Sequence, residues 1–383
     1  MIRVLLRTSV ALVLLAAAAL VGWRVLAPAE VLAGATTPYP PISLRPPGVT
    51  GRTNLAPLIV DGRVRVYAAK HQVKADGPAD GRTLYTARWS FRRWPQQLSG
   101  IVASGTKVIS RWSDGELVAL DARTGKIVWR TDGPDAPGYA GHRTGAAAVW
   151  TPPGLRIAAG TVVVTVGENL AGYDLSTGAE RWRIATPPGC ADGFTTADGA
   201  YVCGTGAYDL ESGAGIAGWP AGPFEPVGCD SGGSGCAGFR DGAGQGWIIG
   251  EGSPQRAAGL DAPGTTIAAG VVVAASETAV SARTADGAQL WSRAGAARIL
   301  GGTSSTVVLL TPDNTLVGVD ARTGTENYSF PLAYGTESTE WKPGGYRLTG
   351  RFLAMERLRE DAPDDPESPV YYLTLDTVII AAL

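Results

Sequence analysis

The sequence has few of the side chains on which metal and redox sites depend. Histidine occurs twice, at His71 and His142, and cysteine four times in 383 residues. Both histidines lie far from the cysteines, so no zinc-type cluster is indicated. The glycine-rich stretch 211–226 lacks the lysine of a phosphate-binding loop, and the acidic stretch 360–369 lacks the Asp-x-Asp-x-Asp-Gly spacing of a calcium loop. We therefore predict no catalytic, cofactor-binding or metal-binding residue.

Charge is also sparse and nearly balanced. Charged residues make up 18% of the chain, hydrophobic residues make up 45%, and the formal net charge is −2. A chain of this length and composition can bury a large core and lacks the signature of disorder. Because there is no excess of positive charge, the composition argues against a nucleic-acid partner.

The N-terminus carries the pattern of a membrane-targeting segment. Two arginines precede an uncharged run over residues 8–23, and a snorkelling arginine with two further apolar residues extends the run to residue 26. We expect a single transmembrane anchor or uncleaved signal over residues 8–26, with a cleaved signal peptide as the alternative. The positive-inside rule then places residues 1–7 in the cytoplasm and the rest of the chain outside it.

Two further regions follow the anchor. Residues 27–53 are rich in proline and glycine and lack apolar periodicity, which predicts an extended linker. Residues 54–383 consist of short β-type runs separated by Gly, Asp and Pro, with almost no helical periodicity. This pattern predicts one all-β domain.

A single pattern recurs four times within the β region. A small residue is followed two positions later by aspartate, then by glycine four positions after the aspartate, and by an aromatic residue eight positions after it; in the third copy an arginine replaces the aspartate. The copies are Ala119, Asp121, Gly125 and Trp129; Gly172, Asp174, Gly178 and Trp182; Ser281, Arg283, Gly287 and Trp291; and Gly318, Asp320, Gly324 and Tyr328.

The chemistry of this pattern indicates a building block. Aspartate can accept hydrogen bonds from backbone amides of a turn, and glycine can adopt the left-handed conformation that closes a hairpin. Each copy is therefore a strand, a turn and a strand, and an isolated hairpin of this kind is marginal in water. We expect the copies to stack, with the small residue making room for a neighbour's ring. The aspartates are structural, because a catalytic group is not needed once per repeat.

The first copy, "ALDARTGKIVW" at residues 119–129, resembles the tryptophan-docking repeat of the quinoprotein-like, PQQ-like-repeat β-propellers. That family includes quinone-dependent alcohol dehydrogenases and BamB-type outer-membrane assembly lipoproteins, and this chain is similar to a membrane-anchored, actinobacterial BamB-like type. The resemblance implies a single propeller over residues 54–383. A further copy keeps only its turn, at Asp209 and Gly213, with Ala217 where the ring is expected.

The spacing of the copies predicts eight blades. One diverged blade is expected near residues 236–260, and one at each end of the β region. Seven blades is the alternative, in which the two terminal segments share one blade and the strand "VIIAAL" pairs beside the first N-terminal strand.

The cysteines fall in the part of the chain expected outside the cytoplasm, where disulfides persist. Of three connectivities, we expect nearest-neighbour pairing, Cys190 with Cys203 and Cys229 with Cys236. The first pair flanks two expected adjacent strands and the second brackets a short loop. Each bond would stabilise a region that lacks its docking ring.

Two stretches carry competing interpretations. Residues 88–97, "RWSFRRWPQQ", fit either an exposed patch for anionic headgroups or a partner, or a strand with Trp89 inward and its arginines in solvent. Residues 211–226 predict a long surface loop suited to a partner. The acidic residues 360–369 predict a solvated connection between strands.

These observations favour a membrane-anchored, extracytoplasmic and monomeric propeller that acts as a non-catalytic scaffold for an envelope protein, with no cofactor. One alternative is a PQQ-dependent dehydrogenase, but the resemblance implies an adjacent Cys-Cys pair and acidic and amide calcium ligands that the sequence does not present. Another is an extracytoplasmic sensor, which would need a separate signalling partner because the expected cytoplasmic tail, residues 1–7, is too short for an output domain.

Overall fold

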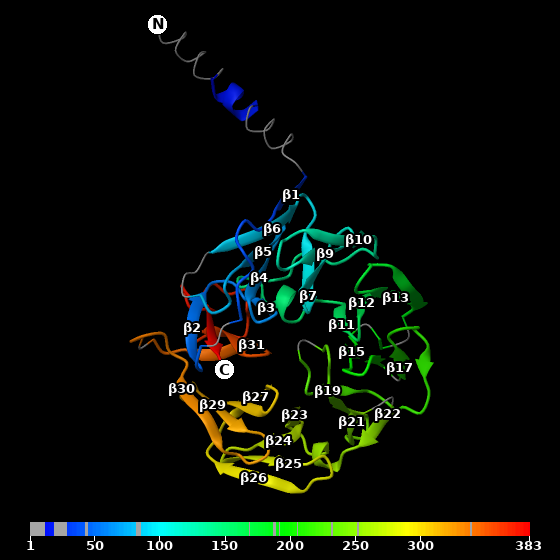
Figure 1. Cartoon of the computed structure of the whole chain (residues 1–383), viewed down its shortest axis with the longest axis vertical. Helices are drawn as coiled ribbons and strands as arrows, with labels where there is room; N and C mark the ends of the chain where they lie inside the picture. The colour runs from blue at the N-terminus through cyan, green and yellow to red at the C-terminus, as the bar shows by residue number, and fades with distance from the viewer. Residues whose placement is uncertain are drawn as a thin grey trace.

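The chain forms a ring of eight antiparallel sheets, the blades of a β-propeller (Figure 1). This arrangement confirms the all-β, eight-bladed prediction. The computed structural model describes residues 12–18, 29–42, 45–81, 86–167, 169–186, 189–190, 192–204, 206–230, 233–250, 253–337 and 339–383.

The first three blades follow one another along the chain. Blade 1 has β3 (Leu58–Val60), β4 (Val64–Ala69), β5 (Gln72–Asp76) and β6 (Ala87–Arg93), with β1 (Glu30–Ala33) added outside β6. Blade 2 has β7 (Leu98–Ser104), β8 (Lys107–Trp112), β9 (Leu117–Asp121) and β10 (Ile127–Thr131). Blade 3 has β11 (Leu155–Ala158), β12 (Thr161–Val166), β13 (Asn169–Asp174) and β14 (Glu180–Ala185).

Blades 4 and 5 are built from shorter strands, and blade 5 is the diverged blade that the spacing predicts. Blade 4 has β15 (Phe194–Thr195), β16 (Ala200–Cys203), β17 (Gly206–Asp209) and β18 (Gly215–Ile216). Blade 5 has β19 (Glu225–Val227), β20 (Gly238–Arg240), β21 (Gly246–Gly250) and β22 (Ser253–Arg256), and the 3-10 helix η1 (Ala258–Leu260) follows it.

Three more blades complete the ring. Blade 6 has β23 (Thr265–Ala268), β24 (Val271–Ala275), β25 (Ala279–Arg283) and β26 (Gln289–Ala294). Blade 7 has β27 (Arg298–Gly302), β28 (Thr306–Leu310), β29 (Thr315–Asp320) and β30 (Glu326–Pro331). Blade 8 has β31 (Lys342–Thr349), β32 (Phe352–Leu358) and β33 (Val378–Ala382), with β2 (Gly48–Thr53) as its outer strand.

The burial of the strands follows from their place in the ring. The first strand of each blade lies nearest the axis and the fourth lies at the rim (Figure 1). Middle strands such as β28, "TVVLL", are buried along their whole length, because a neighbouring blade covers each face. Rim strands such as β14 and β26 are largely exposed except at one central tryptophan.

The ring closes by pairing the two ends of the β region. Strand β2 pairs antiparallel with β33, with Thr53 opposite Val378. This is the shared blade that the sequence associated with a seven-bladed ring, and it occurs here together with eight blades. This pairing joins the two ends of the β region within one sheet and so closes the ring between the last blade and the first.

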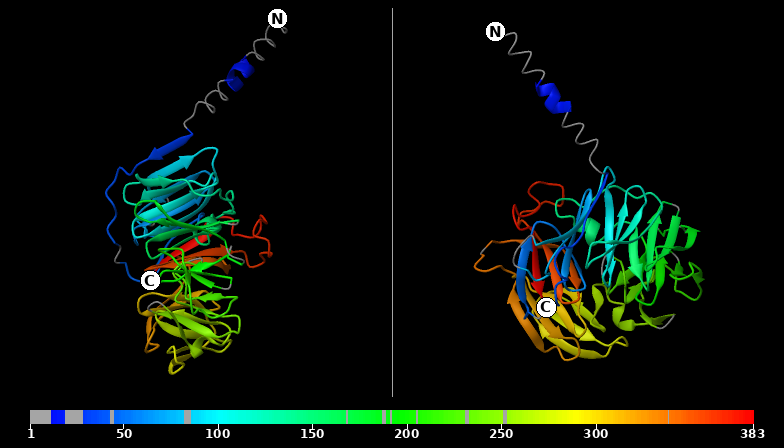
Figure 2. Two further views of the ribbon diagram at one scale, coloured as in Figure 1. Left: turned by 90° about the vertical axis from the view of Figure 1, so that its right-hand side faces the viewer. Right: turned by 45° about the horizontal axis from the view of Figure 1, so that its top comes forward.

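The segment predicted as a linker, residues 27–53, is partly β-structure. Strand β1 extends blade 1 and β2 completes blade 8, so the propeller begins well before residue 54. Between these strands, residues 34–42 and 45–47 run along one face of the disc (Figure 2). The sequence pattern failed here because an edge strand in a composite blade needs little apolar periodicity of its own.

The predicted anchor is described only in part. Residues 12–18 are helical, and the remainder of the 8–26 segment lies outside the described residues, as do residues 1–7. Among the residues that the structure describes, no helix is long and apolar enough to cross a membrane.

Candidate functional site

The repeated motif forms the contacts between neighbouring blades. The Trp129 ring at the end of blade 2 lies on blade 3, where its Nε1 donates to the Leu175 carbonyl oxygen at 3.0 Å. A Cβ atom on Gly178 would lie 2.5 Å from the Trp129 Cε3 atom. Gly178 also has a φ of +76°, so both the turn and the ring contact require glycine there.

Three other blade junctions repeat this contact. In each, a buried tryptophan on a rim strand donates its indole N–H to a backbone carbonyl of the next blade and lies against the turn glycine. The pairs are Trp89 with Ala122 at 2.8 Å, Trp182 with Leu210 at 2.8 Å and Trp291 with Ala321 at 2.9 Å, over Gly125, Gly213 and Gly324. Because Trp89 packs inward, the strand interpretation of residues 88–97 is confirmed for that residue.

One part of the expected packing is wrong. The small residue of the motif makes room for a ring of its own blade, since Gly172 lies directly opposite Trp182 in the β13–β14 pair. A Cβ atom there would lie 2.3 Å from the ring, and one on Gly318 would lie 2.2 Å from the Tyr328 ring. The neighbour's ring instead meets the turn glycine. In the third copy the residue opposite Trp291 is Ala282, not Ser281.

The motif aspartates cap their turns. Asp174 Oδ1 accepts hydrogen bonds from the amides of Ser176 and Thr177, both at 2.8 Å. The bond from Arg181, with those from Thr177, lowers the pKa of Asp174 to about 2. Asp121 and Asp320 accept equivalent backbone bonds. These contacts bind the turn itself, which fits the predicted structural role.

In the third copy, no described ring of the preceding blade packs on the turn. Thr284 takes the aspartate's place in the turn, one position after Arg283, because Gly287 donates to its carbonyl oxygen at 3.0 Å. No described atom lies within 4 Å of a Cβ atom built on Gly287. The reason is on the preceding blade, whose rim strand β22, "SPQR", carries no aromatic residue.

The disulfides lie where docking rings are missing. Cys190 bonds Cys203 and Cys229 bonds Cys236, which confirms nearest-neighbour pairing. The amide of Cys236 donates to the Thr195 carbonyl oxygen at 2.8 Å, so the loop closed by the second disulfide is joined to blade 4. Both bonds therefore support the part of the ring in which blade 4 has no rim tryptophan.

An aromatic cluster also fills the junction of blades 4 and 5. Phe239 is fully buried, and its ring stacks with Trp219 at 5.1 Å and with Trp247 at 6.4 Å between ring centroids. Phe224 meets it edge-on at 5.2 Å. Trp219 and Phe224 come from the 211–226 loop, which we expected to serve a partner. Its largest side chains contact the protein's own core instead.

A cavity of about 880 Å³ occupies the central channel beside blades 5 to 8. It is lined by turns between first and second strands, including Gly270 and residues 301–304. Arg347 and Asp230 are its charged lining residues, and burial lowers the pKa of Arg347 to about 10 and raises that of Asp230. No group of three or more His, Cys, Asp or Glu side chains suited to a metal occurs among the described residues.

Two long connections meet on the opposite face of the disc. One, residues 132–154, joins blades 2 and 3 and includes the short helix α2 (Ala146–Val149); the other, residues 359–377, joins β32 to β33. They form a protrusion, which we term the lobe (Figure 2). In a blade of four antiparallel strands these connections lie at the other end from the turns that line the cavity.

Buried polar contacts hold the first connection of the lobe to the strands of blade 8, and an exposed contact joins it to the second connection. Thr144 Oγ1 donates to Glu356 Oε1 at 2.5 Å, and the Gly345 amide donates to Glu356 Oε2 at 3.2 Å. Burial raises the pKa of Glu356. His142 Nδ1 contacts the Glu367 carboxylate. No local sequence pattern indicates the contacts of Thr144 and His142, because their partners lie more than 200 positions away.

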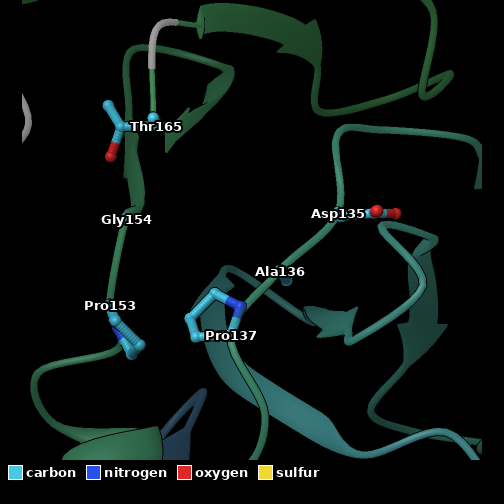
Figure 3. Close-up of a pocket in the computed structure, with 7 residues that line it drawn as sticks. Asp135, Ala136, Pro137, Pro153, Gly154 and Thr165 are labelled. Carbon is cyan, nitrogen blue, oxygen red and sulfur yellow. The ribbon is translucent and has the colours of Figure 1, made fainter.

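A smaller pocket of about 340 Å³ lies at the base of the lobe (Figure 3). Ala136 and Pro137 form one wall, and Pro153 with Gly154 forms the other. Below it, the fully buried Arg111 guanidinium donates to four backbone carbonyls, at distances of 3.2 to 3.3 Å. Burial lowers the pKa of Arg111 to about 10. This arginine ties the walls of the pocket to blade 2.

Comparison with known proteins agrees with this architecture. A family described as outer membrane protein assembly factor BamB matches residues 21–193. A quinone alcohol dehydrogenase subunit from Gluconacetobacter polyoxogenes is 27% identical over 197 residues, 45% of this chain and 26% of that relative. Quinohemoprotein alcohol dehydrogenase ADH IIB from Pseudomonas putida is 29% identical over 147 residues, 35% of this chain and 20% of its own. The matches thus span about a quarter or less of the relatives' length.

Solved structures give similar neighbours. BamB from Moraxella catarrhalis aligns over 92% of this chain and 100% of its own, with 15% identity and a TM-score of 0.44. A quinohemoprotein alcohol dehydrogenase from Comamonas testosteroni aligns over 92% of this chain and 76% of its own, with 15% identity and a TM-score of 0.42. The family match and the eight blades confirm the resemblance to PQQ-like-repeat propellers.

Proposed function

We propose that this PQQ-like β-propeller is a membrane-anchored, extracytoplasmic and non-catalytic scaffold that binds an envelope protein through its lobe. The two disulfides support an extracytoplasmic location, because such bonds persist in oxidising compartments. The uncharged N-terminal run supports the anchor. The description of the matched family, an outer-membrane assembly factor, supports a role in the envelope.

The observation that carries this proposal is the surface of the lobe. Leu375 is 70% exposed and Val370 is 44% exposed, on a connection that contains six acidic residues and a single arginine. Exposed apolar side chains within a polar rim are typical of a protein interaction site. Next to Leu375, the Asp376 amide donates to Asn54 Oδ1 at 2.7 Å and the Thr377 hydroxyl donates to the Asn54 carbonyl oxygen at 3.1 Å, which fixes this end of the connection and lowers the entropic cost of binding. A partner with basic and apolar residues fits this chemistry.

The dehydrogenase alternative is favoured by one feature, the channel cavity with Arg347 on its wall. The curated relatives that match are quinone alcohol dehydrogenases, although the match spans a quarter or less of their length. Against it, the disulfide beside the cavity joins Cys229 and Cys236, seven positions apart, and not adjacent cysteines.

Crosslinking of the full-length protein in its own membrane, followed by mass spectrometry, tests the scaffold proposal. Leu375→Asp should abolish most recovery of the bound envelope protein, because it adds charge to the apolar part of the lobe. Leu290→Asp is the matched control, since Leu290 is 37% exposed on the rim of blade 6. Equal recovery from wild type and Leu375→Asp would refute binding through the lobe.

Titration with pyrroloquinoline quinone and calcium tests the enzyme alternative. We expect no saturable uptake of the quinone by its absorbance. Stoichiometric uptake that Arg347→Ala abolishes would favour the dehydrogenase and place its cofactor in the channel.

A further inference from the structure

The chain enters the propeller at a defined corner of blade 1. Only residues 27–29 separate the predicted anchor from Glu30, the first residue of β1. A chain segment of this length spans at most about 14 Å when fully extended. The following inference rests on the proposed membrane anchoring: if residues 8–26 span the bilayer, this corner lies at the lipid headgroups.

The entry point is held firmly against the blade. Glu30 forms ion pairs with Arg93 of β6 and with Arg130 of the next blade. The amide of Trp94 donates to the Ala29 carbonyl oxygen at 2.7 Å. All four residues of β1 pair in register with β6. The tether therefore leaves the propeller at this corner, and the short reach of residues 27–29 keeps the corner close to the predicted anchor.

The side chains at this corner suit a membrane interface. Trp94 is 40% exposed, and its ring packs on His71 at 4.5 Å between centroids. Lys70 precedes His71 in the β4–β5 turn, and Arg92 lies at the end of β6. Tryptophan concentrates at headgroup level, and lysine and arginine bind anionic headgroups.

Other exposed apolar residues extend the surface along β1. Val31 is 37% exposed and Leu32 is 41% exposed, on a strand whose outer edge has no paired strand among the described residues. By contrast, Arg88 and Arg93 from the same basic stretch are engaged with backbone oxygens and carboxylates, contrary to the expectation of arginines in solvent. The residues that can face lipid are therefore only a part of the stretch 88–97.

We propose that the corner formed by Lys70, Arg92 and Trp94 is a lipid-contact surface, in which the Trp94 ring enters the headgroup layer. This contact places the rim of blade 1 against the bilayer. Lys70 lies in the turn between the second and third strands of blade 1, so this corner is at the lobe end of the blade. The turns that line the channel cavity lie at the other end and stay open to solutes.

The test uses the full-length protein in nanodiscs of phosphatidylcholine and phosphatidylglycerol with brominated acyl chains, which quench nearby tryptophans. The difference in emission between the wild type and Trp94→Phe is the emission of Trp94. The brominated lipid should quench this emission strongly. The emission lost in Trp247→Phe should not be quenched, because Trp247 lies in β21 of blade 5, across the ring from blade 1 (Figure 1). Lys70→Glu combined with Arg92→Glu should reduce quenching of Trp94 about two-fold.

The results separate the inference from its premise. Equal quenching in the wild type and Trp94→Phe overturns the lipid contact while leaving the anchor intact. Failure of the full chain to enter nanodiscs refutes the anchor, and the contact with it. Absence of Trp94 quenching in the nanodiscs, together with a change of its emission when an envelope extract is added, would assign the corner to a protein partner and would also overturn the proposal. An unchanged unfolding midpoint shows that each variant folds.

Discussion

The contacts between neighbouring blades differ between blades 1 to 4 and blades 4 to 6. At the junctions among the first four blades, each tryptophan inserts between a turn glycine and a backbone carbonyl of its neighbour. At the next two junctions no such ring occurs among the described residues. The contacts come instead from the loop closed by Cys229 and Cys236, from the aromatic cluster around Phe239, and from the buried Arg240, which donates to the Thr265 carbonyl oxygen of blade 6 at 2.9 Å. The comparison shows that a docking ring is needed only where nothing else fixes two blades together.

The two regions also differ in how much backbone pairing they contain. The strands of blade 2 have 5 to 7 residues, whereas those of blade 4 have 2 to 4. Shorter strands form fewer ladder hydrogen bonds and bury less apolar surface. Disulfides lower the entropy of the unfolded chain and so offset that deficit.

Removal of a docking ring should have the largest effect. Trp182→Ala is expected to lower the free energy of unfolding by about 3 to 5 kcal/mol, because it deletes a buried ring and leaves a cavity. Trp219→Ala, in the disulfide region, should cost less than half as much, because that ring is partly exposed and lies in a loop. Urea unfolding measures both, and equal losses would contradict the comparison.

Removal of a disulfide should come next. The double change Cys229→Ala and Cys236→Ala is expected to destabilise the protein by about 2 to 3 kcal/mol, from loop entropy. In hydrogen exchange, protection should fall in blades 4 and 5 and persist in blades 1 to 3. A uniform loss of protection around the ring would show that the two regions are not independent.

Matched glycines then separate ring docking from turn conformation. Gly178→Ala is expected to cost about 2 to 3 kcal/mol, since its Cβ atom would strike the Trp129 ring. Gly287 also has a positive φ, +97°, but has open space around the Cβ atom, so Gly287→Ala should cost about 1 kcal/mol. Thermal unfolding of the two variants provides the test, and a larger effect at Gly287 would refute the assignment.

The smallest expected effect concerns the turn carboxylates. The depressed pKa of Asp174 means that its contribution to stability is full above about pH 4 and is lost as the pH falls through about 2. Asp174→Asn should therefore be less stable than the wild type at pH 7, by under about 1 kcal/mol because the group is exposed. This difference should shrink between pH 4 and 2. A difference that widened on acidification would contradict the assigned cause.

The sequence predicts the ring well because its repeat is local. The spacing from Asp174 to Gly178 and Trp182 encodes a turn and its ring without reference to distant residues. The disulfide pairing was predictable for the same reason, since Cys229 and Cys236 bracket one short loop.

The sequence predicts long-range contacts poorly. The sequence predicts a linker where strand β2 lies, because the partner strand of β2 is 330 positions away in blade 8. The lobe depends on the hydrogen bond between Thr144 and Glu356. These residues lie 212 positions apart in the chain and come together only when the ring closes. The sequence also predicts the wrong contact for the motif's small residue. Gly172 and Gly178 are both small, and only the strand register shows which ring lies against each of them.

The pairing of β2 with β33 also has a consequence for biogenesis. A ribosome delivers β2 early and β33 late, so for most of synthesis the nascent chain is an open arc whose first strand has no partner. Contacts of such long sequence separation form slowly. Until β33 is made, the unpaired β2 edge is vulnerable to mispairing with other extended chains, and a chaperone that shields strand edges would act at this stage.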